Sequence, residues 1–242
     1  MAFALDAGPG IDGSQGRNSR AAGCCGGPFS ITNFSSVLCL QRTVAAEDIV
    51  KNILALYGSP RKRGNTSVLL KEAVRGARDG GAAVEEIFLR DLSITPCLEI
   101  YACRETGRCA MRDDFDSLRD KLLSCDALML ASPIFFYTVS AHTKIFMDRC
   151  QEFWSKKYLI DKAPFGLRAP TRKALFISVG ATHGKKLFDG VLLTMKFFLD
   201  TLDMELWGSL LYRGLDGESD VLEHPEYLDD AYRKGNELAG AI

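Results

Sequence analysis

The sequence has little that would mark a nucleic-acid binder or a membrane protein. Its 242 residues carry 30 Lys and Arg against 31 Asp and Glu, and it contains no long basic block. Because nucleic-acid affinity rests largely on neutralising phosphates, we expect no nucleic-acid partner. No stretch reaches the roughly 18 uninterrupted apolar residues typical of a membrane span, and no basic flank precedes an apolar run at the N-terminus. We therefore expect a cytoplasmic protein with no membrane partner.

The composition also gives no reason to expect structural disulfide bonds. With 47% hydrophobic residues, a chain of this length can bury one good core without a disulfide framework. Most of its eight cysteines are therefore expected to be free thiols. Cys125 falls at the start of a predicted strand and Cys150 on the face of a predicted helix, so we expect both in the core.

Residues 1–46 lack a sustained hydrophobic period and are rich in Gly, Ser and Ala. Two interpretations stay open for them: a disordered extension, or a non-native stretch translated from a start codon placed too early. Cys24 and Cys25, which are adjacent there, meet no metal-ligand spacing. Recognisable structure begins near Asp48, so we expect residues 47–242 to form one domain.

Beyond this point, apolar runs typical of buried strands alternate with segments of helical spacing. Strands are predicted at residues 53–57, 83–89, 127–131, 174–179 and 204–212. Helices are predicted from the end of the loop at 58–67 to Gly80, then at 114–124, 140–150, 186–202 and 225–238. This alternation favours an α/β fold, a flavodoxin-like doubly wound sheet of five parallel strands in the order 2-1-3-4-5 with helices on both faces.

The loop after the first strand, residues 58–67, combines glycines with hydroxyl side chains. Its glycines permit close backbone approach, and the helix that follows directs free amides and its positive dipole end at an anion. Neither a Walker lysine nor a Gly-x-Gly-x-x-Gly pattern is present, so the loop indicates a monophosphate site. An ordinary capped surface loop is the alternative. The candidate ligands are Ser59, Arg61, Asn65, Thr66 and Ser67.

Two further loops are expected beside this phosphate loop, at the same edge of the sheet. Residues 133–138 follow the third strand and offer backbone polar groups with aromatic rings, although an aromatic run often only fills a core. Gly180 ends the fourth strand and begins the third wall of the site. His183 is the one candidate catalytic side chain, with a solvated loop histidine as the alternative.

Three motifs together resemble the NADPH-dependent FMN reductases, and within them the iron-sulfur flavoprotein-like branch. The resemblance covers about residues 53–150. The first motif is Gly58-Ser59-Pro60-Arg61 with Gly64-Asn65-Thr66-Ser67. The second is Pro96-Cys97 with Thr106-Gly107-Arg108-Cys109 and Asp113-Asp114. The third is Ser132-Pro133-Ile134-Phe135-Phe136 with Val139-Ser140-Ala141, Lys144 and Asp148-Arg149.

This resemblance implies that FMN is the cofactor and NAD(P)H the reductant. It also implies that the flavin contacts Pro133, Ile134, Phe135 and Phe136, although the family commonly has a small residue near Tyr137. A homodimer or homotetramer is implied as well. At the residue level, Phe153 and Trp154 are candidate interface aromatics, or they pack under the loop at 155–172.

The cysteine register departs from the iron-sulfur branch. That branch places four cysteines in this loop because a [4Fe-4S] cluster needs a thiolate on each iron. Here the corresponding positions are Cys97, Ile100, Cys103 and Cys109, and isoleucine cannot coordinate iron. Cys97, Cys103 and Cys109 stay candidate ligands, but no cluster is the better expectation.

The leading hypothesis is therefore an NAD(P)H-dependent, FMN-containing oxidoreductase of the flavin- or quinone-reductase type, which passes hydride or electrons through bound FMN to a small-molecule acceptor. One alternative is an iron-sulfur flavoprotein-type electron carrier that serves a protein partner. Another is a flavodoxin-like binding module without catalysis, against which the intact hydroxyl set of the phosphate loop argues.

Overall fold

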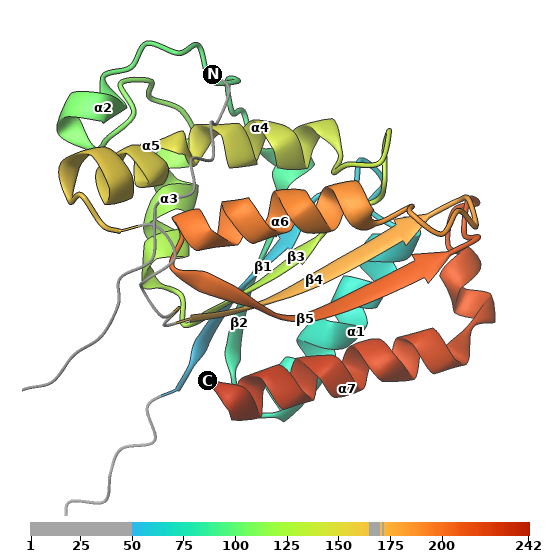
Figure 1. Cartoon of the computed structure of the whole chain (residues 1–242). Helices are drawn as coiled ribbons and strands as arrows, with labels where there is room; N and C mark the ends of the chain where they lie inside the picture. The colour runs from blue at the N-terminus through green and yellow to red at the C-terminus, as the bar shows by residue number, and fades with distance from the viewer. Residues whose placement is uncertain (1–49, 165–169, 171) are drawn as a thin grey trace, which may run out of the picture. The chain divides into compact units, whose positions relative to one another are not determined.

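A computed structural model of the chain describes residues 50–164, 170 and 172–242. In this part of the chain, five parallel strands form one sheet in the order β2-β1-β3-β4-β5, as predicted (Figure 1). The strands are β1 Asn52–Tyr57, β2 Ala83–Phe88, β3 Ala127–Ala131, β4 Arg172–Gly180 and β5 Met204–Arg213. The predictions for residues 1–46, and for the three cysteines before residue 50, lie outside the described residues.

Helices cover both faces of the sheet. The first face carries α1 Asn65–Asp79 and α7 Pro225–Ala241, and the second carries α3 Phe115–Ser124, α4 Ala141–Arg149, α5 Gln151–Trp154 and α6 Asp189–Thr201 (Figure 1). Shorter helical segments are η1 Leu89–Asp91, α2 Cys103–Thr106, the π-helical η2 Ser155–Ile160 and η3 Asp220–Glu223. Five of the helices correspond to predicted ones, and the short segments were not predicted.

Strand alternation explains why both faces are covered. Along β1, Leu54 and Leu56 belong to the core under α3–α6, whereas Ile53, Ala55 and Tyr57 belong to the core under α1 and α7. All five side chains are buried, as expected for a parallel sheet packed on both sides. At about 25 cal/mol for each Å² of apolar surface removed from water, these two cores supply the main stabilisation of the fold.

The structure settles several smaller expectations. Cys125 and Cys150 are buried in the core, and this burial raises the pKa of both thiols, that of Cys125 to about 11. Phe153 is only 8% exposed and packs in the same core, so of the two roles left open for this residue the structure shows packing. Among the described residues, no helix combines the length and apolar character needed to cross a bilayer.

Candidate functional site

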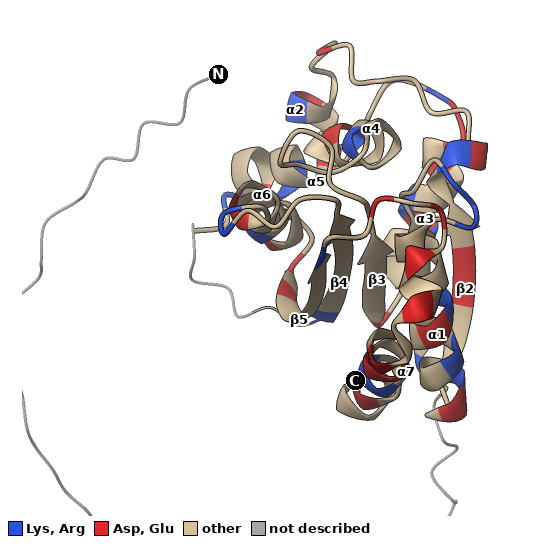
Figure 2. Cartoon of the chain, turned by 90° about the vertical axis from the view of Figure 1, so that its right-hand side faces the viewer, with Lys and Arg blue, Asp and Glu red and all other residues tan. Residues whose placement is uncertain are grey.

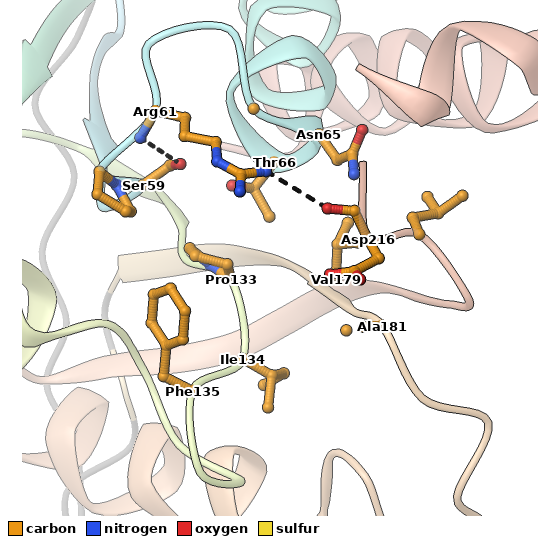
Figure 3. A pocket seen from close by; sticks show the side chains of 14 residues that line it. Ser59, Arg61, Asn65, Thr66, Pro133, Ile134, Phe135, Val179, Ala181 and Asp216 are labelled. Carbon is orange, nitrogen blue, oxygen red and sulfur yellow. Dashed lines mark hydrogen bonds between the residues drawn. The ribbon is translucent and has the colours of Figure 1, made fainter. Parts of the chain in front are cut away.

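A cavity lies at the carboxyl ends of β1, β3 and β4, where the winding of the sheet changes direction. Fourteen residues line it (Figure 3). They are Ser59, Pro60, Arg61, Gly64, Asn65, Thr66, Pro133, Ile134, Phe135, Val179, Gly180, Ala181, Leu215 and Asp216. All three predicted loops contribute residues to this cavity.

Gly58 fixes where the phosphate loop, residues 58–67, leaves β1. A Cβ atom at Gly58 would lie 2.0 Å from Thr143 Oγ1 and 2.8 Å from the Ala131 carbonyl oxygen. Its own carbonyl accepts a hydrogen bond from Ser140 Oγ, the residue that caps α4. Only glycine allows the loop to lie this close to the start of α4.

The start of α1 presents unpaired donors to the cavity. Its N-cap, Gly64, has no side chain, and within the described residues no hydrogen bond is made by the amides of Asn65 and Thr66. The Thr66 hydroxyl likewise has no partner in that part of the chain, although the residue is only 2% exposed and lines the cavity. Together with the helix dipole, these donors suit an anion.

Arg61 lies across this end of the cavity. Its backbone amide donates to Ser59 Oγ at 3.1 Å, and its Nη1 donates to the carbonyl oxygen of Asp216 at 3.3 Å (Figure 3). A neutral carbonyl is a weaker partner for a guanidinium than a phosphate oxygen is. The Arg61 guanidinium can therefore leave this carbonyl and bind an anion at the start of α1.

Two predicted phosphate ligands mainly hold the loops in place. Ser67 Oγ donates to the Arg61 carbonyl at 3.0 Å, and Ser67 does not line the cavity. Asn65 Nδ2 donates to the Gly217 carbonyl at 3.0 Å, and its Oδ1 accepts from the amide of Val221 at 3.0 Å. Asn65 thus bridges the phosphate loop to the segment that precedes α7.

These contacts reveal a wall that the sequence did not indicate. Residues 214–221, between β5 and α7, contribute Leu215 and Asp216 to the cavity. Besides Arg61 and Asn65, Ser219 ties this loop to the phosphate loop, because its Oγ donates to the Arg63 carbonyl at 2.8 Å. Nothing in the local sequence is a phosphate motif, so only the tertiary contacts identify the wall.

The aromatic turn, residues 135–138, closes the other side of the cavity. Of the four residues predicted to contact the flavin, Pro133, Ile134 and Phe135 line the cavity and Phe136 does not. Reciprocal hydrogen bonds of 2.9 and 3.0 Å join Phe135 and Thr138, and φ is +51° at Phe136 and +62° at Tyr137. This left-handed pair costs energy in non-glycine residues and leaves Phe136 99% exposed.

The end of the fourth strand contributes Val179 and Gly180, and Ala181 follows them in the wall, whereas His183 lies outside it. The imidazole of His183 packs over Gly214, where a Cβ atom would lie 2.4 Å from its Cε1. The residue itself is exposed. His183 thus lines no part of the cavity, and a catalytic role for it stays a prediction.

Buried charges, rather than grouped thiols, hold the cysteine segment, residues 96–109. Arg149 is 2% exposed and donates to the Thr95 carbonyl at 2.9 Å and to Asp113 Oδ2 at 2.6 Å. Glu152, also 2% exposed, accepts from the amide of Cys109 at 2.6 Å. Burial would raise the pKa of Asp113, but the hydrogen bond from Arg149 and two backbone amides lower it below the usual 3.8.

The residues present do not fit a four-thiolate cluster. Ile100 occupies the second ligand position and is exposed. The sulfur of Cys103 accepts from Ser155 Oγ at 3.6 Å. Within the described residues, no three His, Cys, Asp or Glu side chains are grouped so that they could hold a metal ion.

Comparisons with known proteins find similar sequences and folds. A family model described as NADPH-dependent FMN reductase matches residues 51–205. An iron-sulfur flavoprotein of Methanocaldococcus jannaschii is 38% identical over 97 residues, which are 40% of this chain and 50% of that protein. A Bacillus subtilis protein named as an NAD(P)H-dependent FMN-containing oxidoreductase is 29% identical over 184 residues, which cover 75% of this chain and 94% of the relative.

Among solved structures, the NAD(P)H:quinone oxidoreductase of Methanothermobacter marburgensis superposes with a TM-score of 0.60 at 16% identity, covering 78% of this chain and 96% of that one. At this identity the likeness shows the fold alone. The chain spans about half the length of the iron-sulfur flavoprotein that it matches.

Proposed function

Because this chain belongs to the NADPH-dependent FMN reductase family, we propose that it is an NAD(P)H-dependent oxidoreductase that works through bound FMN and reduces a small-molecule acceptor. The observation that carries the proposal is the set of unpaired donors at the start of α1, inside a cavity whose opposite side is apolar and aromatic. An amphipathic ligand with one phosphate and one flat ring matches both ends.

The donor set fits the phosphate of FMN. The amides of Asn65 and Thr66 and the Thr66 hydroxyl offer hydrogen bonds, and Arg61 offers a positive charge. Ser59, whose hydroxyl lines the same end, is assigned as a further donor. We assign Asn65 and Ser67 to positioning, since their side chains are bonded to other loops.

The ring end is assigned to Pro133, Ile134, Phe135 and Gly180. Their side chains and backbone exclude water from one side of a flat ligand and orient it against the sheet edge. When bound, FMN supplies hydride acceptance and donation, so the protein needs no side-chain nucleophile. Phe136 is assigned to the rim, because it projects into solvent.

Further parts of the proposal concern the whole protein. We assign residues 47–242 to one FMN-binding domain and place it in the cytoplasm, where free thiols such as Cys97 and Cys103 persist. We also propose a homodimer or homotetramer, supported by the exposed side chains of Leu193 and Phe197 on α6. Sedimentation of the purified protein tests the last point, and a monomer at micromolar concentration would contradict it.

The main proposal is tested by reconstituting the purified protein with FMN and following NADPH and NADH oxidation with quinone, free flavin and dye acceptors. We expect flavin absorption in the visible spectrum and turnover with at least one acceptor. Protein that takes up no FMN would favour a non-catalytic module. Iron and sulfide analysis after anaerobic purification tests the electron-carrier alternative, and we expect neither element.

A further inference from the structure

The segment between β4 and α6, residues 181–188, carries unneutralised positive charge at the mouth of the cavity. It leaves the wall directly at Ala181 and continues through the exposed Lys185 and Lys186. Among the residues that the structure describes, neither lysine has an ion pair, whereas Lys62 lies 2.6 Å from Asp91. We call residues 181–188 the basic segment.

Arg213, at the end of β5, holds this segment in place. Its Nε donates to the Gly184 carbonyl at 3.2 Å, and its Nη2 donates to the Lys185 carbonyl at 3.3 Å. Its guanidinium also lies 4.9 Å from the ring centroid of Phe188. The backbone that carries the two lysines is therefore fixed, and a further cation adds to the local charge.

The aromatic turn packs beside the basic segment. Tyr137 Oη lies 3.9 Å from the Cβ position at Gly184, and the Tyr137 carbonyl oxygen lies 2.8 Å from the Cβ position at Gly190. Phe136, the neighbouring residue, presents its ring to solvent. The exposed aromatic turn and the segment that carries the two lysines therefore adjoin each other.

An aromatic face next to ammonium groups has the chemistry that binds an adenosine phosphate. Purines stack on aromatic side chains, and phosphate oxygens accept charge-assisted hydrogen bonds from lysine. If the proposed function holds, the nicotinamide of the reductant must enter the cavity, and its adenosine half then stays at the rim. Since the two exposed lysines follow the lining residue Ala181 by only a few positions and line no part of the cavity, they suit the outer half of the reductant.

We propose that Lys185 and Lys186 bind the 2′-phosphate of NADPH, with Phe136 packed on its adenine, so that the basic segment selects NADPH over NADH. This assignment rests on the proposed function. The pyrophosphate is common to both nucleotides, and the 2′-phosphate belongs to NADPH alone. Discrimination between the two nucleotides is therefore the property that identifies the contact.

The test is the double variant Lys185→Ala/Lys186→Ala, loaded with FMN and compared with Lys71→Ala/Lys196→Ala. The control loses the same charge from exposed lysines on α1 and α6. We expect kcat/KM for NADPH to fall about tenfold in the first variant, the loss expected for charge-assisted contacts at an exposed site, with kcat/KM for NADH unchanged. In the control, both values should stay at the wild-type level.

A second readout does not depend on turnover. Calorimetric titration with 2′,5′-ADP and with 5′-AMP should show weaker 2′,5′-ADP binding in the Lys185→Ala/Lys186→Ala variant only. If kcat/KM fell equally for NADPH and NADH, the lysines would contact the pyrophosphate that both nucleotides share, and the proposal would be overturned. An unchanged kcat/KM for NADPH would also overturn it. If wild-type protein oxidises neither nucleotide, the proposed function fails, whereas the titration still decides whether the lysines recognise a 2′-phosphate.

Discussion

The two ends of the cavity are built in opposite ways. The phosphate loop is mostly buried and tied by hydrogen bonds to α4 and to the loop at 214–221, and its unpaired donors face inward. The aromatic turn is exposed, and positive φ angles at Phe136 and Tyr137 hold it there. Under the proposed function, one chain thus completes the anion end of the cavity, whereas the ring end stays accessible to the reductant, the acceptor or a second subunit.

The same contrast extends to the two faces of the sheet. Acidic and basic residues are mixed along α1 and α7 (Figure 2), and pairs such as Arg233 with Glu237 neutralise each other there. On the opposite face, α6 exposes Leu193 and Phe197. We infer that the α1/α7 face meets water, while the face next to the aromatic turn is the one available for contacts.

The largest effect is expected from Gly58→Ala. The added Cβ would lie 2.8 Å from the Ala131 carbonyl, a backbone atom that cannot move without disturbing β3. Overpacking of this kind costs about 1–3 kcal/mol or more, and the displaced loop should lose its affinity for FMN. Urea denaturation and quenching of FMN fluorescence measure the two effects.

The matched control for this change is Gly240→Ala, where an added Cβ meets nothing within 4 Å. Because Gly240 lies in α7, alanine there should leave the free energy of unfolding unchanged or raise it by up to about 1 kcal/mol. If the Gly58→Ala protein bound FMN tightly, the phosphate end of the cavity would not be preformed. The structural contrast between the phosphate end and the aromatic end would then not hold.

The next effect is expected from Thr66→Val, which removes one donor and keeps the side-chain volume. One net hydrogen bond to a charged group is worth about 1.5–3 kcal/mol, so the Kd for FMN should rise by at least tenfold. Riboflavin, which lacks the phosphate, should bind as it does to the wild type. Equal weakening for both ligands would place Thr66 at the ring rather than at the phosphate. Thr194→Val, on α6, is the control.

Much of this arrangement could be predicted from the sequence where local signals are strong. The strand at 127–131 matches to the residue, because an uninterrupted apolar run ends at Ser132-Pro133. The phosphate loop could be found because its glycines and hydroxyls follow a buried strand directly. Both features depend on residues that are neighbours in the sequence.

Features made by distant residues could not be found in this way. Asp216 reaches the cavity only because Asn65 and Ser219 fasten its loop, and these contacts span more than 150 positions in the sequence. The exposure of Phe136 was missed for another reason. A turn with two positive φ angles is normally signalled by Gly or Asn, and an aromatic run typically indicates packing instead.

The cysteine segment sharpens the comparison, because buried charges fasten it, whereas hydrogen bonds to backbone carbonyls mainly fasten the phosphate loop. The lowered pKa of Asp113 means that its ionised form is stabilised in the folded protein. Its contribution is present above the usual carboxyl pKa of 3.8 and is lost as the pH falls through the lowered value. Asp113→Asn should therefore cost about 1–3 kcal/mol at pH 6 and less at pH 2.5.

Urea unfolding at the two pH values measures this difference. Asp148→Asn, which breaks the exposed pair with Lys144, should change stability by less than about 1 kcal/mol at either pH. A cost for Asp113→Asn that did not depend on pH would mean that shape, and not charge, fastens the segment.

The smallest effect on stability is expected from Phe136→Asn, which tests the exposed end. Asparagine tolerates the left-handed conformation better than phenylalanine does, so the free energy of unfolding should stay constant or rise by about 0.5–1 kcal/mol. The Kd for FMN should change by less than about threefold, because Phe136 lines no part of the cavity, and each tenfold change would need about 1.4 kcal/mol of lost contact.

Thermal unfolding and FMN titration check this variant, with Tyr137→Asn as its partner at the other left-handed position. If Phe136→Asn weakened FMN binding tenfold, the ring at Phe136 would fold back over the flavin. The ring end would then be closed by the same chain, and the contrast with the phosphate end would disappear. If FMN binding is unchanged while binding of the reductant weakens, Phe136 contacts the reductant and not FMN.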